Sequence, residues 1–371
     1  MTPRPPNTPV EPPTLEDVAR RAGVSTATVS RCLNVPERVA PATRTRIESA
    51  VAALGYAPNF GAKALMSRRT GTFGAVIPTM ANAVFARGLQ AFQEALVARG
   101  ATLLVASSSY DPEIEENEIR ALVARGADGL LLIGTERRPE VRRFLERRRT
   151  PVVIGWTWFS AGRGSCVGFD NVAASRALAE RALALGHRRF ACVSARRKGN
   201  DRARDRVAGV ALALGGAGLD AAALPVIETV YSIEAGAEAF ERAMALEPRP
   251  TVVMCGNDVL AVGAVRRARA LGLAVPGDVS VTGFDDLELA TVVEPALTTV
   301  HVPHREMGRR AAELLLARAG GETGHGRVRL ETRVVERESL GPAPRSGPGI
   351  RRRARGPLAT PPSRADTPRR R

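Results

Sequence analysis

The sequence TLEDVARRAGVSTATVSRCLN, residues 14–34, predicts two short helices joined by a tight turn. Gly23 lies between them and can adopt the left-handed conformation that reverses the chain. Ser25 is expected to cap the second helix. A third helix is predicted to follow, with Pro41 near its start. Together these features predict a three-helix helix-turn-helix domain over residues 14–58.

The outer face of the second helix presents Thr26, Ala27, Ser30 and Arg31. Short side chains let a helix enter the major groove of DNA, and an arginine can bind a guanine edge or a phosphate. The domain is therefore predicted to bind double-stranded DNA, and the alternative is an ordinary three-helix mini-domain. The candidate DNA contacts here are Thr14, Ser25, Thr26, Ala27, Thr28, Ser30, Arg31 and Asn34.

Positive charge is concentrated at the two ends of the 371-residue chain, whose formal net charge is +16. Residues 1–70 hold ten Lys or Arg and five Asp or Glu, and residues 341–371 hold nine and one, whereas residues 71–340 are nearly balanced. This distribution is typical of a nucleic-acid-binding segment joined to another kind of domain. For the tail, arginine-rich coding is an equally good explanation. Residues 1–13 and the tail are expected to be disordered.

The body alternates apolar runs of strand length with alanine-rich amphipathic segments. Examples are GTFGAVIP at 71–78, TVVMCGND at 251–258 and the helical pattern NVAASRALAERALALGH at 171–187. This alternation predicts βαβ units with buried parallel strands. About seven such units suggest two doubly wound α/β subdomains.

Several classes of protein are disfavoured by composition. No run of about 18 apolar residues is present, so a membrane span is not expected. The first 13 residues lack the apolar segment of a secretory signal, and a cytoplasmic protein is expected. The four cysteines, Cys32, Cys166, Cys192 and Cys255, form no CxxC pair. Neither a disulfide framework nor a metal site is therefore expected.

Polar and aromatic side chains follow the predicted strands, where doubly wound folds bind their ligands. Their mixture of aromatic faces, carboxylates, amides and arginines suits a polyhydroxylated or anionic small molecule. No nucleophile–base pair and no phosphate-binding loop stands out, so a catalytic role and a cofactor are not expected. A sugar-metabolising enzyme remains an alternative. The candidate ligand contacts are Asn82, Phe85, Trp156, Trp158, Asp170, Arg196, Arg197, Arg206, Asn257 and Asp285, while Asp258 is expected to cap the helix that follows it.

GVSTATVSRCLN, residues 23–34, closely resembles the helix-turn-helix of the lactose/galactose-repressor (LacI/GalR) family, and residues 54–74 resemble that family's hinge region. The resemblance extends from about Thr14 to Leu340. It implies a hinge over residues 59–70 that forms a helix on operator DNA. Leu65 would be inserted into the minor groove, and the further hinge contacts would be Asn59, Ala62 and Lys63.

The same resemblance implies a periplasmic-binding-protein-like body over 71–340 that binds an effector and dimerises. Its subdomains would comprise about 71–169 with 300–328, and 170–299 with 329–340. Arg206 is the strongest candidate ligand contact, because DRVAGVALA at 205–213 matches the family motif. A homodimer is expected, because two helix-turn-helix domains can then bind the two halves of a pseudo-palindromic operator. Positions matching Asp170, Arg206, Asn257 and Asp285 would line the effector cleft.

Within the family, IPTMANAVFARGLQAF at 77–92, residues 167–187 and the pair Tyr231-Ser232 resemble the gluconate-responsive repressors. Tyr231 is therefore a further candidate ligand contact. A sugar acid needs a cation for its carboxylate, which Arg196, Arg197 or Arg206 could supply. The alternatives are a regulator that responds to a purine or a neutral sugar, and a solute-binding protein without a regulatory role.

Overall fold

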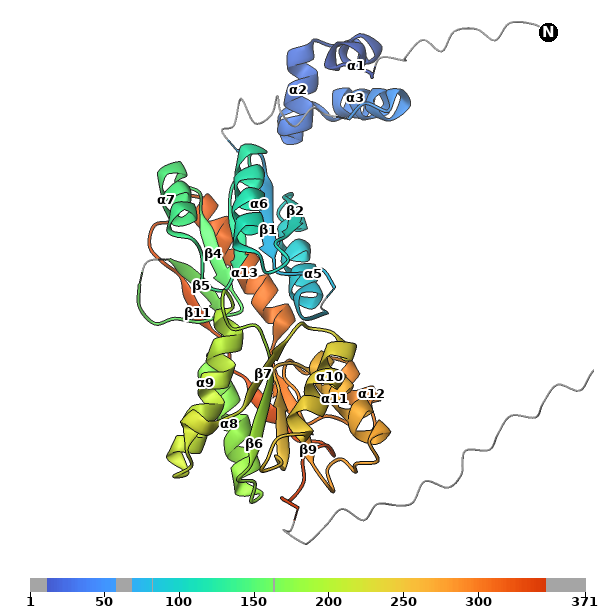
Figure 1. Ribbon diagram of the computed structural model, residues 1–371. Coiled ribbons are helices and arrows are strands. Elements are labelled where there is room, and N and C mark those ends of the chain that lie inside the picture. Colours follow the sequence, from blue (N-terminus) through green and yellow to red (C-terminus); the bar gives the residue numbers. More distant parts are fainter. Residues whose placement is uncertain (1–11, 58–68, 82, 163, 345–371) are drawn as a thin grey trace, which may run out of the picture. The chain divides into compact units, whose positions relative to one another are not determined.

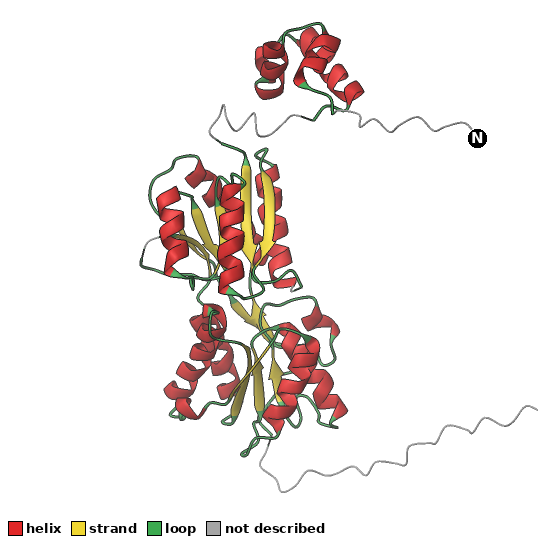
Figure 2. Cartoon of the chain, turned by 45° about the horizontal axis from the view of Figure 1, so that its top comes forward, coloured by secondary structure: helices red, strands yellow, loops and turns green. Residues whose placement is uncertain are grey.

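The computed structural model describes residues 12–57, 69–81, 83–162 and 164–344 (Figures 1 and 2). It contains a helical head and a body of α/β units. The chain divides into unit 1, Met1–Gly168 with His304–Leu330, and unit 2, Phe169–Pro303 with Glu331–Arg371. In the described ranges, no helix combines the length and apolar character that crossing a bilayer requires. The predicted fold class is confirmed.

The head consists of the three predicted helices and one short 3-10 turn. Thr14 and Asp17 form a reciprocal capping box at the first helix, and Gly23 ends that helix with φ +65°. Ser25 Oγ accepts a hydrogen bond from the amide of Thr28 at 3.2 Å, so the predicted cap is confirmed. The elements are α1 (Leu15–Ala22), α2 (Thr26–Asn34), η1 (Pro36–Arg38) and α3 (Pro41–Leu54).

A small apolar core holds these helices together. Val18, Val29 and Ile47 are completely buried, one from each helix. Ala40 precedes α3 without a side-chain cap, and Pro41 occupies the first turn, where its fixed φ suits a helix and its missing N–H leaves no donor unpaired. The helix ends and the apolar core of the head are thus stabilised by residues of the head itself.

Unit 1 contains a six-stranded parallel sheet with helices on both faces. The central strands are buried between helices and are therefore mostly apolar. The two edge strands are more exposed. The strand order is β11 (Arg327–Arg329), β5 (Ser165–Gly168), β4 (Val152–Gly155), β3 (Leu130–Ile133), β1 (Thr72–Ile77) and β2 (Thr102–Ser107). The helices are α5 (Ala83–Val97), α6 (Pro112–Ala124), α7 (Pro139–Arg148) and α13 (His304–Ala319).

Unit 2 contains a four-stranded parallel sheet and a separate antiparallel pair. The parallel order is β7 (Val226–Thr229), β6 (Phe190–Ala195), β8 (Val252–Cys255) and β9 (Ser280–Thr282), and β10 (Thr299–His301) pairs with β12 (Arg333–Val335). The helical elements are α8 (Asn171–Ala184), α9 (Asp201–Gly216), η2 (Ala221–Ala223), α10 (Ile233–Met244), α11 (Asp258–Ala270) and α12 (Leu289–Val292).

The segment predicted to be disordered from Gly341 onward is instead attached to unit 2 as far as Ala343. His187 is fully buried, and its Nε2 donates to the Gly341 carbonyl at 3.0 Å. The Gly341 amide donates to Ser280 Oγ at 3.1 Å, and the Ala343 amide donates to the Leu185 carbonyl at 2.9 Å. These hydrogen bonds give His187 a structural role and correct the boundary of the predicted tail.

Candidate functional site

The predicted recognition face of α2 is available at the surface of the head. Thr26, Ala27 and Arg31 are exposed, and Ser30 is half-buried. Three other predicted DNA contacts also stabilise the helix starts: Thr14 caps α1, while Ser25 and Thr28 share the cap of α2 with their hydroxyls 2.9 Å apart. Asn34 is the last residue of α2. The predicted hinge contacts Asn59, Ala62, Lys63 and Leu65 lie outside the described residues.

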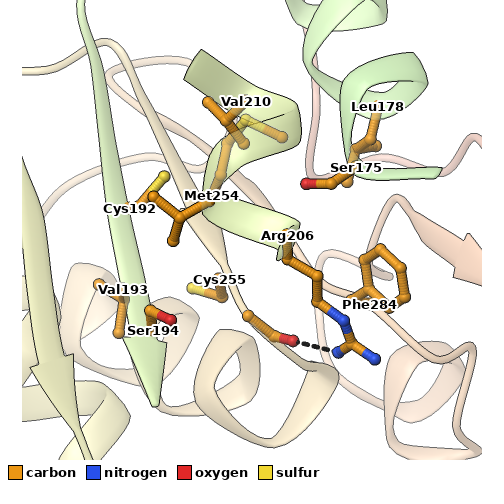
Figure 3. A pocket seen from close by; sticks show the side chains of 12 residues that line it. Ser175, Leu178, Cys192, Val193, Ser194, Arg206, Val210, Met254, Cys255 and Phe284 are labelled. Carbon is orange, nitrogen blue, oxygen red and sulfur yellow. Dashed lines mark hydrogen bonds between the residues drawn. The ribbon is translucent and has the colours of Figure 1, made fainter. Parts of the chain in front are cut away.

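In unit 2, the centre of the predicted ligand site is a buried arginine. Arg206, one turn into α9, donates from Nε to Asn171 Oδ1 at 3.0 Å. Its NH1 donates to the Gly256 carbonyl at 2.6 Å, and its NH2 to Asp285 Oδ1 at 3.3 Å. The guanidinium also stacks 3.8 Å from the centre of the Phe284 ring. Figure 3 shows Arg206 beside Phe284, with its hydrogen bond to the Gly256 carbonyl as a dashed line. The predicted residues Arg206 and Asp285 are thus brought together as a buried ion pair.

Asp285 reaches Arg206 through an unusual backbone. Asp285 and Asp286 both have left-handed conformations, with φ +102° and +54°, which non-glycine residues rarely adopt. The Asp286 carboxylate faces other partners, His301 Nδ1 at 2.8 Å and Arg337 NH2 at 2.7 Å. Burial alone would raise the pKa of Asp286, but the hydrogen bonds from Arg337 and His301 lower it overall. Two adjacent carboxylates are therefore fixed in different directions.

The expectation for Asp258 was wrong, and Asn257 provides the helix cap instead. Asn257 Oδ1 accepts from the Leu260 amide at 3.0 Å at the start of α11. The Asp258 carboxylate is fully buried and accepts from the Leu287 amide at 2.7 Å and the Thr299 hydroxyl at 2.6 Å. Asp258 thus fixes the turn after β9 that carries Asp285. Asn257 Nδ2 is buried and has no hydrogen-bond partner among the described residues.

Other polar groups near Arg206 were not all predicted. Tyr231 precedes α10, hydrogen-bonds the Asn200 side chain and has its phenol pKa raised by burial. Asn200 caps α9, and the buried Arg202 and Asp201 side chains pair at 2.8 Å. Asn171, Asn200, Asp201, Arg202 and Phe284 were missed, although Asn171 and Phe284 adjoin predicted residues in FDN and GFDD.

The remaining predicted contacts in unit 2 lie in two settings. Asp170 Oδ1 accepts from the Ala173 amide at 2.9 Å and caps α8. Arg196 and Arg197 are exposed on the loop after β6, and Arg197 pairs with Glu228 at 2.6 Å.

A space of about 20 Å³ beside Arg206 is bounded by β6, β8, α8 and α9 (Figure 3). It has room for roughly one water, so a sugar cannot occupy it.

In unit 1, the predicted aromatic contacts belong to the core. Phe85 and Trp156 are 4% and 1% exposed, with ring centroids 5.5 Å apart. The Trp156 ring also stacks on His304, 6.3 Å away. Trp158 is half-buried under the Arg329 guanidinium at 4.7 Å. Asn82 lies outside the described residues. The structure therefore gives Phe85 and Trp156 a packing role, which their position after a strand did not reveal.

The thiols and acidic groups of the described chain do not suggest catalysis. Burial raises the pKa of the Cys192 thiol to about 12, so the reactive thiolate is scarce at neutral pH. All four cysteines are buried. Within the described ranges, no three His, Cys, Asp or Glu side chains are grouped to hold a metal ion.

Comparison with known proteins identifies the family. The family model "Bacterial regulatory proteins, lacI family" matches residues 14–59, and a periplasmic binding protein-like domain matches 179–340. The HTH-type transcriptional regulator GntR of Escherichia coli K12 is 35% identical over 314 residues, which cover 84% of this chain and 93% of that protein. The chain belongs to the LacI family of transcriptional regulators.

Two further comparisons support membership of the LacI family. The HTH-type transcriptional repressor PurR of Vibrio atlanticus is 33% identical over 333 residues, covering 88% of this chain and 98% of that protein. The crystal structure of the lac repressor dimer bound to operator and the anti-inducer ONPF matches with a TM-score of 0.77 and 27% identity, covering 89% of this chain and 100% of that chain. This LacI-family protein is thus a DNA-binding regulator, not an enzyme and not a solute-binding protein without a regulatory role.

The buried Asp258 gives this LacI-family regulator a predicted pH dependence. Burial raises the pKa of Asp258 to about 7, against about 4 in an unfolded chain. Between these values the folded protein binds the extra proton, so its stability falls as the pH rises and levels off above pH 7. Asp258→Asn cannot titrate.

We expect the unfolding free energy of the wild type, relative to Asp258→Asn, to fall by up to about 1.4 kcal/mol per pH unit from pH 5 to 7. Thermal unfolding of both proteins at pH 5, 6, 7 and 8 measures this difference. A difference that stays constant across the range would contradict the prediction.

Proposed function

We propose that this regulator is a repressor whose affinity for a pseudo-palindromic operator is controlled by a small sugar or sugar acid. Gluconate and its keto derivatives are the favoured class. The effector binds unit 2 beyond the carboxyl ends of β6, β8 and β9, and the regulator acts as a homodimer in the cytoplasm. The proposal for a sugar acid rests on the resemblance of residues 77–92 and 167–187 to the gluconate-responsive repressors.

The observation that carries the effector proposal is the pairing of Arg206 with Asp285 beside an unsatisfied donor. The pair is buried and charge-balanced, and it offers fixed N–H donors and carboxylate acceptors. Asn257 adds an amide donor that is 1% exposed and has no partner in the part of the chain that the structure describes. An unsatisfied buried donor is unfavourable by about 1–3 kcal/mol, and a ligand hydroxyl would remove that penalty. Neighbouring donors and acceptors of this kind suit a polyol.

The cation for a carboxylate should come from outside this cluster. Arg206 is neutralised by Asp285, and Arg202 by Asp201. Arg197 pairs with Glu228, whereas Arg196 is exposed on the same loop. We therefore assign the carboxylate of the sugar acid to Arg196 and its hydroxyls to Arg206, Asp285 and Asn257. Asp170 and Tyr231 are proposed as further contacts.

Calorimetric titration of the full chain with gluconate, ketogluconates, neutral hexoses and a purine base tests the proposal. We expect gluconate or a ketogluconate to bind, and Arg196→Gln to weaken that binding at least about tenfold, as losing a charge-assisted hydrogen bond implies. Lys198→Gln removes an exposed charge two residues away and should have little effect. The bound effector should change operator affinity by about 5–150-fold in a mobility-shift assay. Binding of only neutral sugars or only a purine would overturn the sugar-acid assignment.

A further inference from the structure

One edge of the unit 1 sheet carries a row of exposed arginines. In a parallel sheet with crossover helices, the helices end where the strands begin. Arg99 follows α5, Arg125 follows α6, and Arg147 and Arg148 lie in the last turn of α7, before Arg149. All five side chains are exposed. We call Arg99, Arg125, Arg147, Arg148 and Arg149 the arginine edge.

The chain that comes from the head enters the body at this same edge. The Thr70 and Gly71 amides donate to the Asp128 carboxylate at 3.0 and 2.8 Å, and the Thr70 hydroxyl donates to the Gly126 carbonyl at 2.7 Å. These contacts attach the start of β1 to the loop that begins with Arg125. The amides also occupy the Asp128 carboxylate. The nearby exposed carboxylates are Glu146 and Glu322, so the edge keeps an excess of positive charge.

The corresponding edge of unit 2 uses its arginines differently. Arg188 donates to the Leu183 and His187 carbonyls at 3.0 and 2.8 Å, and Arg189 donates to the Arg249 carbonyl at 2.8 Å. Over the described ranges, no hydrogen bond or ion pair is found for the side chains of Arg99, Arg125, Arg147 or Arg149. The unit 2 arginines stabilise helix ends and loops, whereas the unit 1 arginines remain available to an external anion.

From these observations we infer that the arginine edge binds the phosphate backbone of the DNA held by the head. The inference rests on DNA binding by this family member but adds a contact surface on the body. Eleven residues separate the last described residue of the head, Ala57, from Arg69, and a chain of that length reaches at most roughly 40 Å. The DNA is therefore tethered close to the arginines. Their contacts strengthen binding without reading sequence.

The salt dependence of DNA affinity, measured with the full chain, reports how many phosphate contacts the protein makes. The probes are a duplex selected by the wild-type protein from a random library and a random-sequence duplex of equal length. We expect Arg99→Gln/Arg125→Gln/Arg147→Gln to reduce the slope of log affinity against log salt by at least about one, since each phosphate contact contributes about 0.9. The affinity ratio between the two duplexes should stay unchanged.

Two control proteins keep the result unambiguous. Arg242→Gln/Arg266→Gln/Arg269→Gln removes three exposed charges from α10 and α11 and should leave the slope unchanged. Arg99→Lys/Arg125→Lys/Arg147→Lys keeps the charge and should retain the wild-type slope. An unchanged slope in the first triple variant, or an equal reduction in the α10–α11 control, would overturn the inference. Failure of the wild type to bind any duplex would instead overturn DNA binding itself.

Discussion

Arg206→Leu is expected to destabilise unit 2 by about 3–5 kcal/mol and to abolish effector binding. The variant leaves the Asp285 carboxylate, 2% exposed, without its cation. It also removes the donor groups that now satisfy Asn171 and the Gly256 carbonyl. A buried charge without a partner is far more unfavourable than the intact pair is favourable. Differential scanning calorimetry should show a fall of more than about 6 °C for a domain of this size.

The double variant Arg206→Leu/Asp285→Asn separates two causes of the lower stability: the uncompensated charge of Asp285 and the lost hydrogen bonds of Arg206. Removing the carboxylate as well should restore part of the stability, because no uncompensated charge remains. Effector binding should stay lost in the double variant, since neither the guanidinium of Arg206 nor the carboxylate of Asp285 is present. If Arg206→Leu unfolds at the wild-type temperature, the pair does not stabilise unit 2 as expected. If the variant still binds the effector with wild-type affinity, the pair is not part of the effector site.

Gly209→Ala is expected to destabilise unit 2 by about 1–3 kcal/mol through overpacking. Gly209 lies one turn after Arg206 on α9, where a Cβ atom would be 2.3 Å from the Val172 carbonyl oxygen of α8. A backbone atom cannot move aside without separating the two helices. Since Asn171 of α8 binds Arg206 of α9, the same separation should also weaken effector binding.

Gly215→Ala is a matched control within the same helix. No atom lies within 4 Å of a Cβ built at Gly215, so the substitution should raise stability by up to about 1 kcal/mol through helix propensity. Thermal unfolding and effector titration of both variants measure the contrast. Equal effects of the two substitutions would contradict the close helix packing at Gly209.

The head was predictable because its signals are local. Gly23, Ser25 and Pro41 act within a few residues of their position, so the turn and the helix starts could be read directly from the sequence. Most strands of the parallel sheets were predictable because they form apolar runs, and β1, β6 and β8 do so because they are buried between helices.

The short peripheral strands were not predictable. β11 reads RVR and β12 reads RVV, and each pairs with a strand more than thirty residues away in sequence. Their pairing is decided by tertiary structure rather than by local periodicity. β7, with the sequence VIET, likewise lacks a distinctive apolar run.

The sequence pointed to some residues of the candidate site but not to their connections. Arg206, Asn257 and Asp285 follow strands or a motif, yet the sequence gives no sign that the Gly256 carbonyl and Asn171 also bind the guanidinium. Trp156 follows a strand as a ligand contact would, but Gly88 leaves room for its indole against α5. The position of a residue after a strand therefore indicates which end of the sheet it lies at, but not which groups its side chain contacts.

The turn at Asp285 and Asp286 limits how this protein can be stabilised. Each left-handed non-glycine residue stores about 1–3 kcal/mol of conformational strain, and glycine would relieve it at either position. Both carboxylates are occupied, however, one by Arg206 and the other by Arg337 and His301. A glycine at position 285 would therefore relax the backbone but break the link between the turn and α9. A glycine at position 286 would break the links from the turn to β10 and to the segment after β12.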